Sequence, residues 1–288
     1  MSAALILGRA RRKVLVCDAG KPRNRTAREM HGYLTREGIG PLDFLRLGRS
    51  ELRRYDGVRL VHGLVADARA SKNGFEVRLA SGKRFAARKL LLATGLTDEL
   101  PPMAGVNRLL GKSVFQCPYC HGWEARGAPV VVYGRGERAM EMARALTAWT
   151  SDLAVCAEGG LGRADRAALS RNGVHVEDES IARLESNGER LEAVVLSSGK
   201  RLPCRFLFFN TPSRQQSDLA RRLGCSFTAN GGVRCGKYES TDVPGVYVAG
   251  NAIKDVHLVV AAAAEGARAA LGINKALTRE DFDRRAFC

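Results

Sequence analysis

Short apolar stretches rich in β-branched residues recur along the chain, and several of them run into glycine or an acidic residue. This pattern is typical of strands. The six clearest stretches lie at 13–17, 89–93, 129–133, 152–156, 205–209 and 245–249. Between them, apolar positions repeat at helical spacing over 3–11, 41–55, 137–149, 163–171 and 259–271. Strands that alternate with helices predict parallel sheets covered on both faces.

Two antiparallel hairpins interrupt this alternation. One joins 75–79 to 84–86 through Ser-Gly, and the other joins 191–196 to 201–202 through the same dipeptide. Such two-residue turns favour hairpins. The order of parallel unit, hairpin and returning strand therefore occurs twice. We predict an α/β protein with two Rossmann-like, three-layer (ββα-type) nucleotide-binding domains, each with an antiparallel excursion.

A glycine-rich turn joins the predicted strand 129–133 to the helix that follows it. The turn reads Gly134-Arg-Gly136-Glu-Arg-Ala139, which matches the G-x-G-x-x-G/A pattern in its strand–turn–helix context. Small residues at these three positions let the backbone approach a pyrophosphate at the positive end of a helix. The turn therefore predicts a dinucleotide site.

Acidic and basic residues after the next strands bear on which nucleotide binds. Glu158 follows the strand 152–156, where an acid suits the ribose diol of NADH, whereas Arg163 or Arg166 would suit the 2′-phosphate of NADPH. The sequence leaves this choice open. Asp18 ends the first strand, the usual place for an acid that binds an adenosine ribose.

The sequence begins inside the first predicted helix. A strand and a glycine-rich turn are expected ahead of the helix at 3–11, and Met1-Ser-Ala-Ala supplies neither. We therefore expect a first domain that lacks its first strand and its main pyrophosphate cradle. A start codon upstream of Met1 would account for this.

Cys117-Pro-Tyr-Cys120 is the sharpest chemical signal in the sequence. The spacing allows a reducible disulfide with one thiol of depressed pKa. With His121 it also spells the haem attachment pattern C-x-x-C-H, although haem attachment normally needs export. It could be half of a zinc site, but no second C-x-x-C exists. A glutaredoxin-like domain does not fit, because only 13 residues separate Cys120 from Gly134. We favour the redox dithiol.

Composition narrows the class of protein. The 288 residues carry 46 Lys and Arg against 30 Asp and Glu, a formal charge of +16, and 45% are hydrophobic. This excludes a mainly disordered chain. The longest apolar run, 258–264, is too short to cross a bilayer, and the charge order at the start is the reverse of a secretory signal. We expect a cytoplasmic protein without membrane partners. Nucleic acid is not expected, because the positive charges are spread along the chain without a recognition motif.

The ordered motifs together resemble a known family. They are Ala-Thr-Gly at 93–95, the segment 117–124, the glycine turn, the segment 240–251 ending in Ala-Gly-Asn, and Ala-Ala-Ala-Ala-Glu-Gly at 261–266. This set resembles the low-molecular-weight thioredoxin reductases and their relatives, which include dithiol oxidases. The resemblance covers nearly the whole chain.

The resemblance implies an organisation and a reaction. An FAD-binding domain would comprise 1–113 and 243–288, and an NAD(P)H-binding domain with the dithiol would comprise 114–242. Hydride would pass from NADPH, with NADH not excluded, to FAD and then to the disulfide. The electron acceptor would be a thioredoxin-like protein or a small-molecule disulfide, and the enzyme would be a homodimer without a metal.

The resemblance also implies residue roles. Cys120 would face the flavin, Cys117 would exchange with the substrate disulfide, and His121 would stand where the family often has a proton-handling acid, with a pKa in the neutral range. His31, His62 and His175 have no such context and are expected on the surface or in loops. The flavin-binding positions would be Asp18, Thr94, Gly95, Gly250, Asn251 and His257.

Four departures from the family pattern define an alternative. The first glycine turn is missing, Asn251 replaces an aspartate, His257-Leu258 stands where glutamine is expected, and the basic cluster that grips the NADPH phosphate is absent. The alternative hypothesis is a degenerate, flavin-free relative that binds a nucleotide or a partner protein without catalysis.

Overall fold

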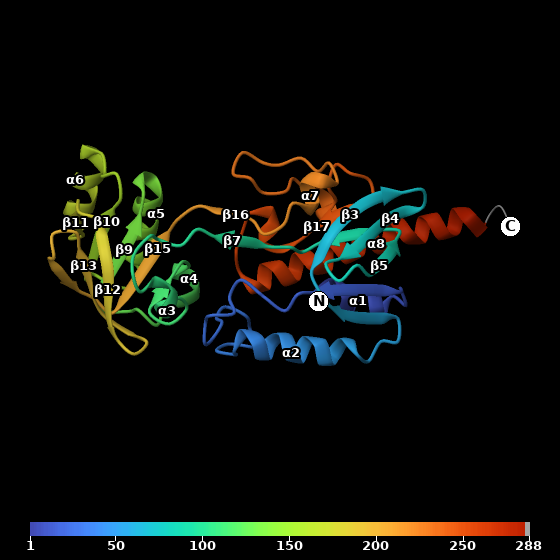
Figure 1. The fold of residues 1–288 in the computed structure, drawn as a ribbon, viewed down its shortest axis with the longest axis horizontal. Coiled ribbons are helices and arrows are strands. Elements are labelled where there is room, and N and C mark those ends of the chain that lie inside the picture. The colour runs from blue at the N-terminus through green and yellow to red at the C-terminus, as the bar shows by residue number, and fades with distance from the viewer. Residues whose placement is uncertain (286–288) are drawn as a thin grey trace. The chain divides into compact units, whose positions relative to one another are not determined.

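The chain forms two compact units in this computed structural model, which describes residues 1–285, so that Cys288 lies outside the described part (Figure 1). Unit 1 comprises Met1–Arg23, Leu42–Thr97 and Arg214–Cys288, and unit 2 comprises Asn24–Pro41 and Asp98–Ser213. Both units are therefore built from separate stretches of chain. Their boundaries fall near 97 and 213, whereas the sequence-based domains divide at 113 and 242 and assign 24–41 to the first domain.

Unit 2 is built around a five-stranded parallel sheet in the order β11-β10-β9-β15-β8. Its strands are β8 (Val114–Phe115), β9 (Val130–Gly134), β10 (Leu153–Ala157), β11 (His175–Glu177) and β15 (Phe206–Asn210). Strand β9 pairs with β10 on one side and β15 on the other, and all five of its residues are buried. The strand that carries the glycine turn is thus the centre of the sheet, as in a Rossmann-type unit.

Opposite faces of this sheet pack against different layers. Val130 and Val132 of β9 pack with the apolar faces of α5 (Gly136–Leu146) and α6 (Arg163–Arg171). Val131 and Tyr133 pack instead with the three-stranded antiparallel sheet. That sheet consists of β12 (Ile181–Asn187), β13 (Arg190–Leu196) and β14 (Arg201–Pro203). Because side chains alternate along a strand, one central strand serves both cores of a three-layer unit.

Unit 1 repeats the same layering with a sheet in two pieces. Strand β1 (Val14–Asp18) pairs in parallel with β2 (Val58–His62), and β6 (Leu90–Leu92) pairs in parallel with β17 (Val246–Val248). The antiparallel sheet contains β3 (Val65–Ser71), β4 (Gly74–Leu79) and β5 (Arg84–Ala87). The helices are α1 (Ser2–Arg9), α2 (Pro41–Leu52) and α8 (Val259–Arg285).

Strand β17 shows how unit 1 holds together. Val246 and Val248 pack with Phe75 and Val77 of the antiparallel sheet, whereas Tyr247 packs with α1 and α8. In Figure 1 the first helix, in blue, and the last, in red, accordingly belong to the same unit. The remaining elements are short: α3 (Val106–Leu109), α4 (Pro118–His121), α7 (Leu219–Arg222), β7 (Leu96–Asp98), which pairs with β16 (Ser213–Gln215), and the 3₁₀ turns η1 (Lys237–Glu239) and η2 (Gly250–Ile253).

The predicted α/β class, the parallel sheets and both hairpins are confirmed. Helix α1 begins at Ser2, and the strand and glycine turn that the resemblance implies ahead of it are not among residues 1–285. The predicted helix 259–271 is too short, because α8 runs to Arg285.

Candidate active site

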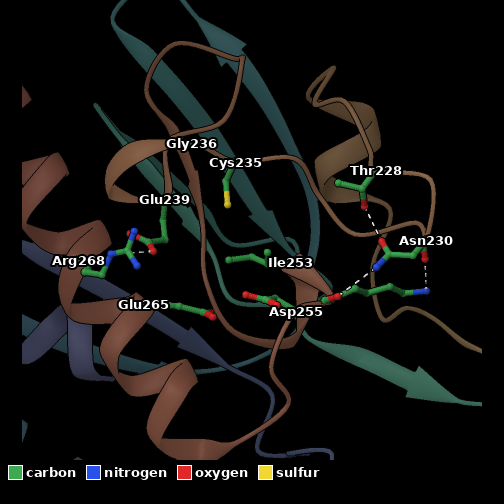
Figure 2. A pocket seen from close by; sticks show the side chains of 10 residues that line it. Thr228, Asn230, Cys235, Gly236, Glu239, Ile253, Asp255, Glu265 and Arg268 are labelled. Carbon is green, nitrogen blue, oxygen red and sulfur yellow. Dashed lines mark hydrogen bonds and ion pairs between the residues drawn. The ribbon is translucent and has the colours of Figure 1, made fainter. Parts of the chain in front are cut away.

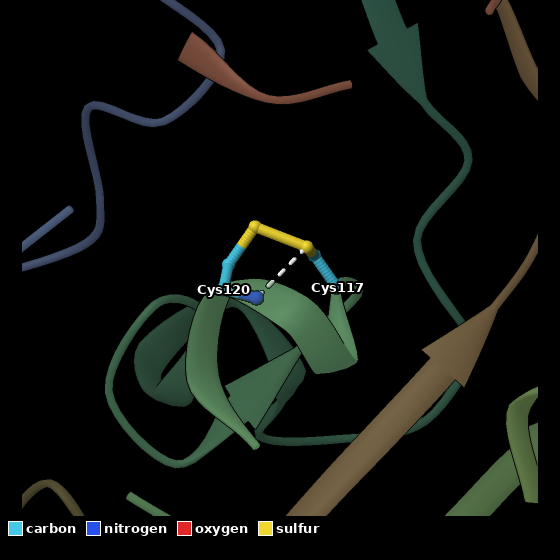
Figure 3. The surroundings of a disulfide bond; sticks show 2 residues. All are labelled: Cys117 and Cys120. Atoms are coloured by element: carbon cyan, nitrogen blue, oxygen red, sulfur yellow. Dashed lines mark hydrogen bonds between the residues drawn. A yellow bond between two sulfur atoms is a disulfide. The ribbon is translucent and has the colours of Figure 1, made fainter. Parts of the chain in front are cut away.

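Cys117 and Cys120 form a disulfide with Cα atoms 5.2 Å apart (Figure 3). Cys117 is the N-cap of α4, and its Sγ accepts a hydrogen bond from the backbone N–H of Cys120 at 3.1 Å. Pro118 occupies the first helical position, where the missing N–H costs nothing. Both cysteines are half-buried, and Tyr119 between them is exposed. After reduction, the same N–H would stabilise a thiolate on Cys117, because a hydrogen-bond donor interacts more strongly with a charged sulfur than with a neutral one.

His121 directly follows the disulfide and is held as a neutral base. Its ring stacks on buried Phe115 with centroids 4.0 Å apart and planes 11° from parallel. Burial, with a smaller effect of His31, lowers the pKa of His121 to about 4. The sequence-based expectation of a near-neutral pKa is therefore wrong, because it took no account of desolvation.

The two ring nitrogens of His121 differ in their partners. The ring makes a hydrogen bond with the backbone of Glu29, whereas Nδ1 is buried without any partner. Since a neutral imidazole carries one N–H, the bond to Glu29 assigns the proton to Nε2 and leaves the lone pair of Nδ1 free. An unpaired buried acceptor of this kind is costly, which is typical of functional positions.

His31 is the neighbour that the sequence did not reveal. It lies in a loop, as predicted, but its side chain is only 14% exposed and its ring stands edge-on to His121, with centroids 5.8 Å apart. Its Nδ1 is 2.7 Å from the Glu37 carboxylate, and its Nε2 is within 4 Å of Glu29 and Glu124. Three acids thus gather around His31, which in turn contacts His121. Sequence separation of 90 residues hides such a cluster.

The predicted dinucleotide turn lies at the carboxyl end of β9. Gly134 ends the strand and Gly136 begins α5 with φ +48°. A Cβ at Gly134 would be 3.1 Å from the Cα of buried Ala139, so the strand and helix approach too closely for a side chain there. Glu158 follows β10, next to this turn, because its N–H donates to the Gly134 carbonyl at 2.9 Å. These positions fit a pyridine dinucleotide.

The predicted flavin-binding residues all lie in unit 1, and all except His257 lie near carboxyl ends of parallel strands. Thr94 and Gly95 follow β6, and Gly250 and Asn251 follow β17, its hydrogen-bonded neighbour. Asp18 ends β1. Nucleotides bind at this edge of open α/β sheets, so the placement of these residues fits a flavin dinucleotide.

Two of these positions, Asp18 and Gly250, have further contacts. The Asp18 carboxylate accepts hydrogen bonds from the Gly20 N–H at 2.8 Å and from Arg49 at 2.7 Å. Gly250, at φ +75°, donates its N–H to Glu265 at 2.5 Å. His257 is exposed in the loop before α8.

A pocket with several acidic residues in its lining includes Glu265, which accepts the Gly250 N–H (Figure 2). It has a volume of about 380 Å³, and its lining includes Glu239, Asp255, Glu265 and the half-buried thiol of Cys235. Glu239 pairs with Arg268 at 3.2 Å, and burial raises the pKa of both Glu239 and Glu265. The lining carries three carboxylates against two cations, Lys254 and Arg268, and Arg268 is already paired with Glu239, so we do not assign this pocket to the flavin phosphates.

Two further findings concern metals and membranes. In residues 1–285, no group of three or more His, Cys, Asp or Glu side chains is arranged to hold a metal ion. A zinc site at Cys117 and Cys120 therefore finds no further ligands there. Among the described helices, none is long and apolar enough to span a bilayer.

Two layered nucleotide-binding units, one of them carrying a C-x-x-C disulfide, define a dinucleotide-dependent disulfide oxidoreductase. The model of the pyridine nucleotide-disulphide oxidoreductase family matches residues 1–266, and the chain belongs to this family. The family uses flavin and pyridine nucleotide, and the chain is a thioredoxin reductase-like NAD(P)H:disulfide oxidoreductase.

Named relatives agree with this assignment. The chain is 29% identical to the thioredoxin reductase sirT of Leptosphaeria maculans over 95% of this chain and 90% of that protein. It is 28% identical to the thioredoxin reductase tcpT of Claviceps purpurea over 87% and 82% of the two chains. The crystal structure of HlmI superposes with a TM-score of 0.95 at 35% identity, covering 99% of this chain and 91% of that one. None of these findings favours the flavin-free alternative.

Proposed function

We propose that the enzyme passes an electron pair from NADPH or NADH, through FAD, to the Cys117–Cys120 disulfide and on to a thioredoxin-like protein or a small-molecule disulfide. The observation that carries this proposal is the half-buried disulfide next to His121, whose free Nδ1 is a neutral base. Named thioredoxin reductases among the relatives support the substrate class.

Cys117 and Cys120 carry out the thiol–disulfide exchange in the proposed reaction. Bound flavin would supply the electron pair that opens the disulfide. Cleavage leaves one sulfur as a thiolate and the other as a thiol, with one proton taken up. Cys117, whose Sγ accepts the Cys120 N–H, is the thiolate that attacks one sulfur of the substrate disulfide, and the other substrate sulfur leaves as a thiolate that takes the second proton from solvent. Cys120 then attacks Cys117 in the mixed disulfide, which restores the enzyme disulfide and releases the substrate as a dithiol.

His121 moves the proton in this sequence. Its Nδ1 accepts the proton of the Cys120 thiol as that sulfur attacks, and it passes the proton to the departing substrate thiolate. His121 is unprotonated at neutral pH because its pKa is about 4, so its Nδ1 holds the proton only in passing, while the Cys120–Cys117 bond forms. The balance over one cycle is two electrons and two protons per substrate disulfide reduced.

The remaining assignments follow from the family resemblance and from strand-end placement. FAD is held by the domain formed from 1–113 and 243–288 through Asp18, Thr94, Gly95, Gly250, Asn251 and His257. NAD(P)H is held by 114–242 through Gly134, Gly136 and Ala139. The active form is a homodimer, which sedimentation equilibrium tests by mass.

The test uses the purified flavin-loaded protein and an aromatic disulfide that absorbs on reduction, with NADPH and NADH in separate arms. Cys117→Ser and Cys120→Ser are expected to abolish disulfide reduction. Cys235→Ser, which removes a thiol that takes no part in a disulfide, is the matched control and is expected to retain full turnover. Reduction that persists in Cys117→Ser would contradict the proposal.

A further inference from the structure

A three-residue cluster in unit 2 stands next to the predicted dinucleotide turn. Arg135, inside the turn, donates from Nε and Nη2 to the two oxygens of Glu158, at 3.0 and 2.7 Å. The hydroxyl of Tyr133 donates to the same carboxylate at 2.5 Å. The cluster joins neighbouring strands, because β9 leads to Arg135 and β10 leads to Glu158.

The charges of the cluster are fixed at working pH. Hydrogen bonds from Arg135 and then Tyr133 lower the pKa of Glu158 to about 2, so Glu158 is ionised. Burial, followed by the bond to Glu158, raises the pKa of Tyr133, so Tyr133 keeps its proton and remains a donor. Glu158 therefore keeps one neutral partner even if Arg135 moves away.

The two charged residues differ in mobility. The side chain of Arg135 is 72% exposed, whereas that of Glu158 is 32% exposed and anchored by Tyr133. Of the two arginines that the sequence suggests for a 2′-phosphate, Arg166 is less available, since it bonds to Asp178 and to the Leu161 carbonyl, whereas Arg163 begins α6. Arg135 can turn toward a ligand while Glu158 stays in place.

Arg135 and Glu158 carry opposite charges at a position that could distinguish the two nicotinamide coenzymes. NADPH and NADH differ only at the 2′ position of the adenosine ribose, which carries a phosphate in NADPH and a hydroxyl in NADH. In a Rossmann-type unit the end of the second strand lies near the 2′ position of the adenosine ribose, where a carboxylate accepts the 2′-hydroxyl and an arginine meets a 2′-phosphate. NADPH has to turn Arg135 away from the carboxylate, whereas the 2′-hydroxyl of NADH can donate to the acceptor site of Glu158 that Arg135 and Tyr133 leave open.

We propose that the Arg135–Glu158 pair is a two-way coenzyme discriminator. NADPH draws Arg135 onto its 2′-phosphate, and NADH places its 2′-hydroxyl on Glu158. The inference rests on the proposed function, in which unit 2 binds NAD(P)H. It assigns dual coenzyme use to the unmodified protein, with affinities within about tenfold of each other.

The test measures dissociation constants of NAD⁺ and NADP⁺ by calorimetry on the oxidised, flavin-loaded protein, so that no electron transfer intervenes. Arg135→Gln is expected to weaken the affinity for NADP⁺ by about tenfold or more and to change the affinity for NAD⁺ by less than about threefold. Glu158→Gln is expected to weaken the affinity for NAD⁺ by about tenfold and to leave the affinity for NADP⁺ unchanged or increased. Arg171→Gln, an exposed change of equal charge in the last turn of α6, is the control and should alter neither.

The outcomes separate the two claims. If the unmodified protein binds neither nucleotide, the proposed function fails. If it binds them but Arg135→Gln and Glu158→Gln leave the NAD⁺/NADP⁺ affinity ratio unchanged, only the discriminator is overturned. Arg135→Lys keeps the charge and should retain most NADP⁺ affinity. If Arg135→Lys binds both nucleotides as weakly as Arg135→Gln does, Arg135 acts on folding and the discriminator is also overturned.

Discussion

Replacing His121 with glutamine should remove an acid-sensitive component of the stability of unit 2. Folding lowers the pKa of His121 from 6.5 to about 4. Between these values the unfolded chain binds more protons than the folded one, so stability rises with pH. The contribution is fully present above the unfolded pKa and is lost as pH falls toward the folded pKa. From pH 7.5 to pH 5.0, the loss from this one histidine is about 2 kcal/mol.

The measurement is urea unfolding at pH 7.5 and pH 5.0, followed by tryptophan fluorescence. The chain has two tryptophans, Trp123 and Trp149, and both belong to unit 2. From pH 7.5 to pH 5.0, the free energy of unfolding of His121→Gln should fall by about 2 kcal/mol less than that of wild type. Arg171→Gln, an exposed change on α6 of the same unit that removes no imidazole, is the control and should keep the pH dependence of wild type. An equal fall in wild type and His121→Gln would refute the assignment of His121 as a buried neutral base.

Three further outcomes follow from the structure. His31→Gln should raise the pKa of His121, because His31 contributes to lowering it; an imidazole titration by NMR that shows no rise would contradict the contact. Gly134→Val should weaken NAD⁺ and NADP⁺ binding by about tenfold or more, since a Cβ would be 3.1 Å from the Ala139 Cα; unchanged calorimetric affinity would count against the turn as the dinucleotide site. Phe208→Ala, at a fully buried side chain of β15 that packs in the same core as β9 and α5, should destabilise unit 2 by about 3–5 kcal/mol in urea. Phe282→Ala, 73% exposed on α8, should change stability by less than about 0.5 kcal/mol.

Local patterns explain which parts of the fold could be predicted. Strand β9, its turn and α5 are contiguous in sequence, and both Ser-Gly hairpins close over a few residues, so their signals are complete within short windows. Strand β2 was missed because Val58–His62 contains a charge and is half-exposed. The end of α8 was missed because residues 272–285 form helix without a strong apolar stripe, although their Arg, Glu and Leu favour helix.

Contacts between distant segments limited how much of the candidate site could be predicted from the sequence. The Cys117–Cys120 pair was visible from its spacing, and His121 from its adjacency. Neither the stacking of His121 on Phe115 nor its contact with His31 has a sequence signal, because both depend on how distant segments pack. Glu158 was visible as an acid after a strand, but its bidentate partner Arg135 was counted only as a turn position.

Anaerobic reductive titration of the purified flavin-loaded enzyme tests the central claim most directly, since it counts electrons taken up by each chain. Flavin and disulfide each accept two, so wild type should take up four and Cys117→Ser two, with both new thiols of wild type trapped by alkylation at Cys117 and Cys120. Uptake of two electrons by both proteins, with the disulfide intact after the flavin is reduced, would contradict the account.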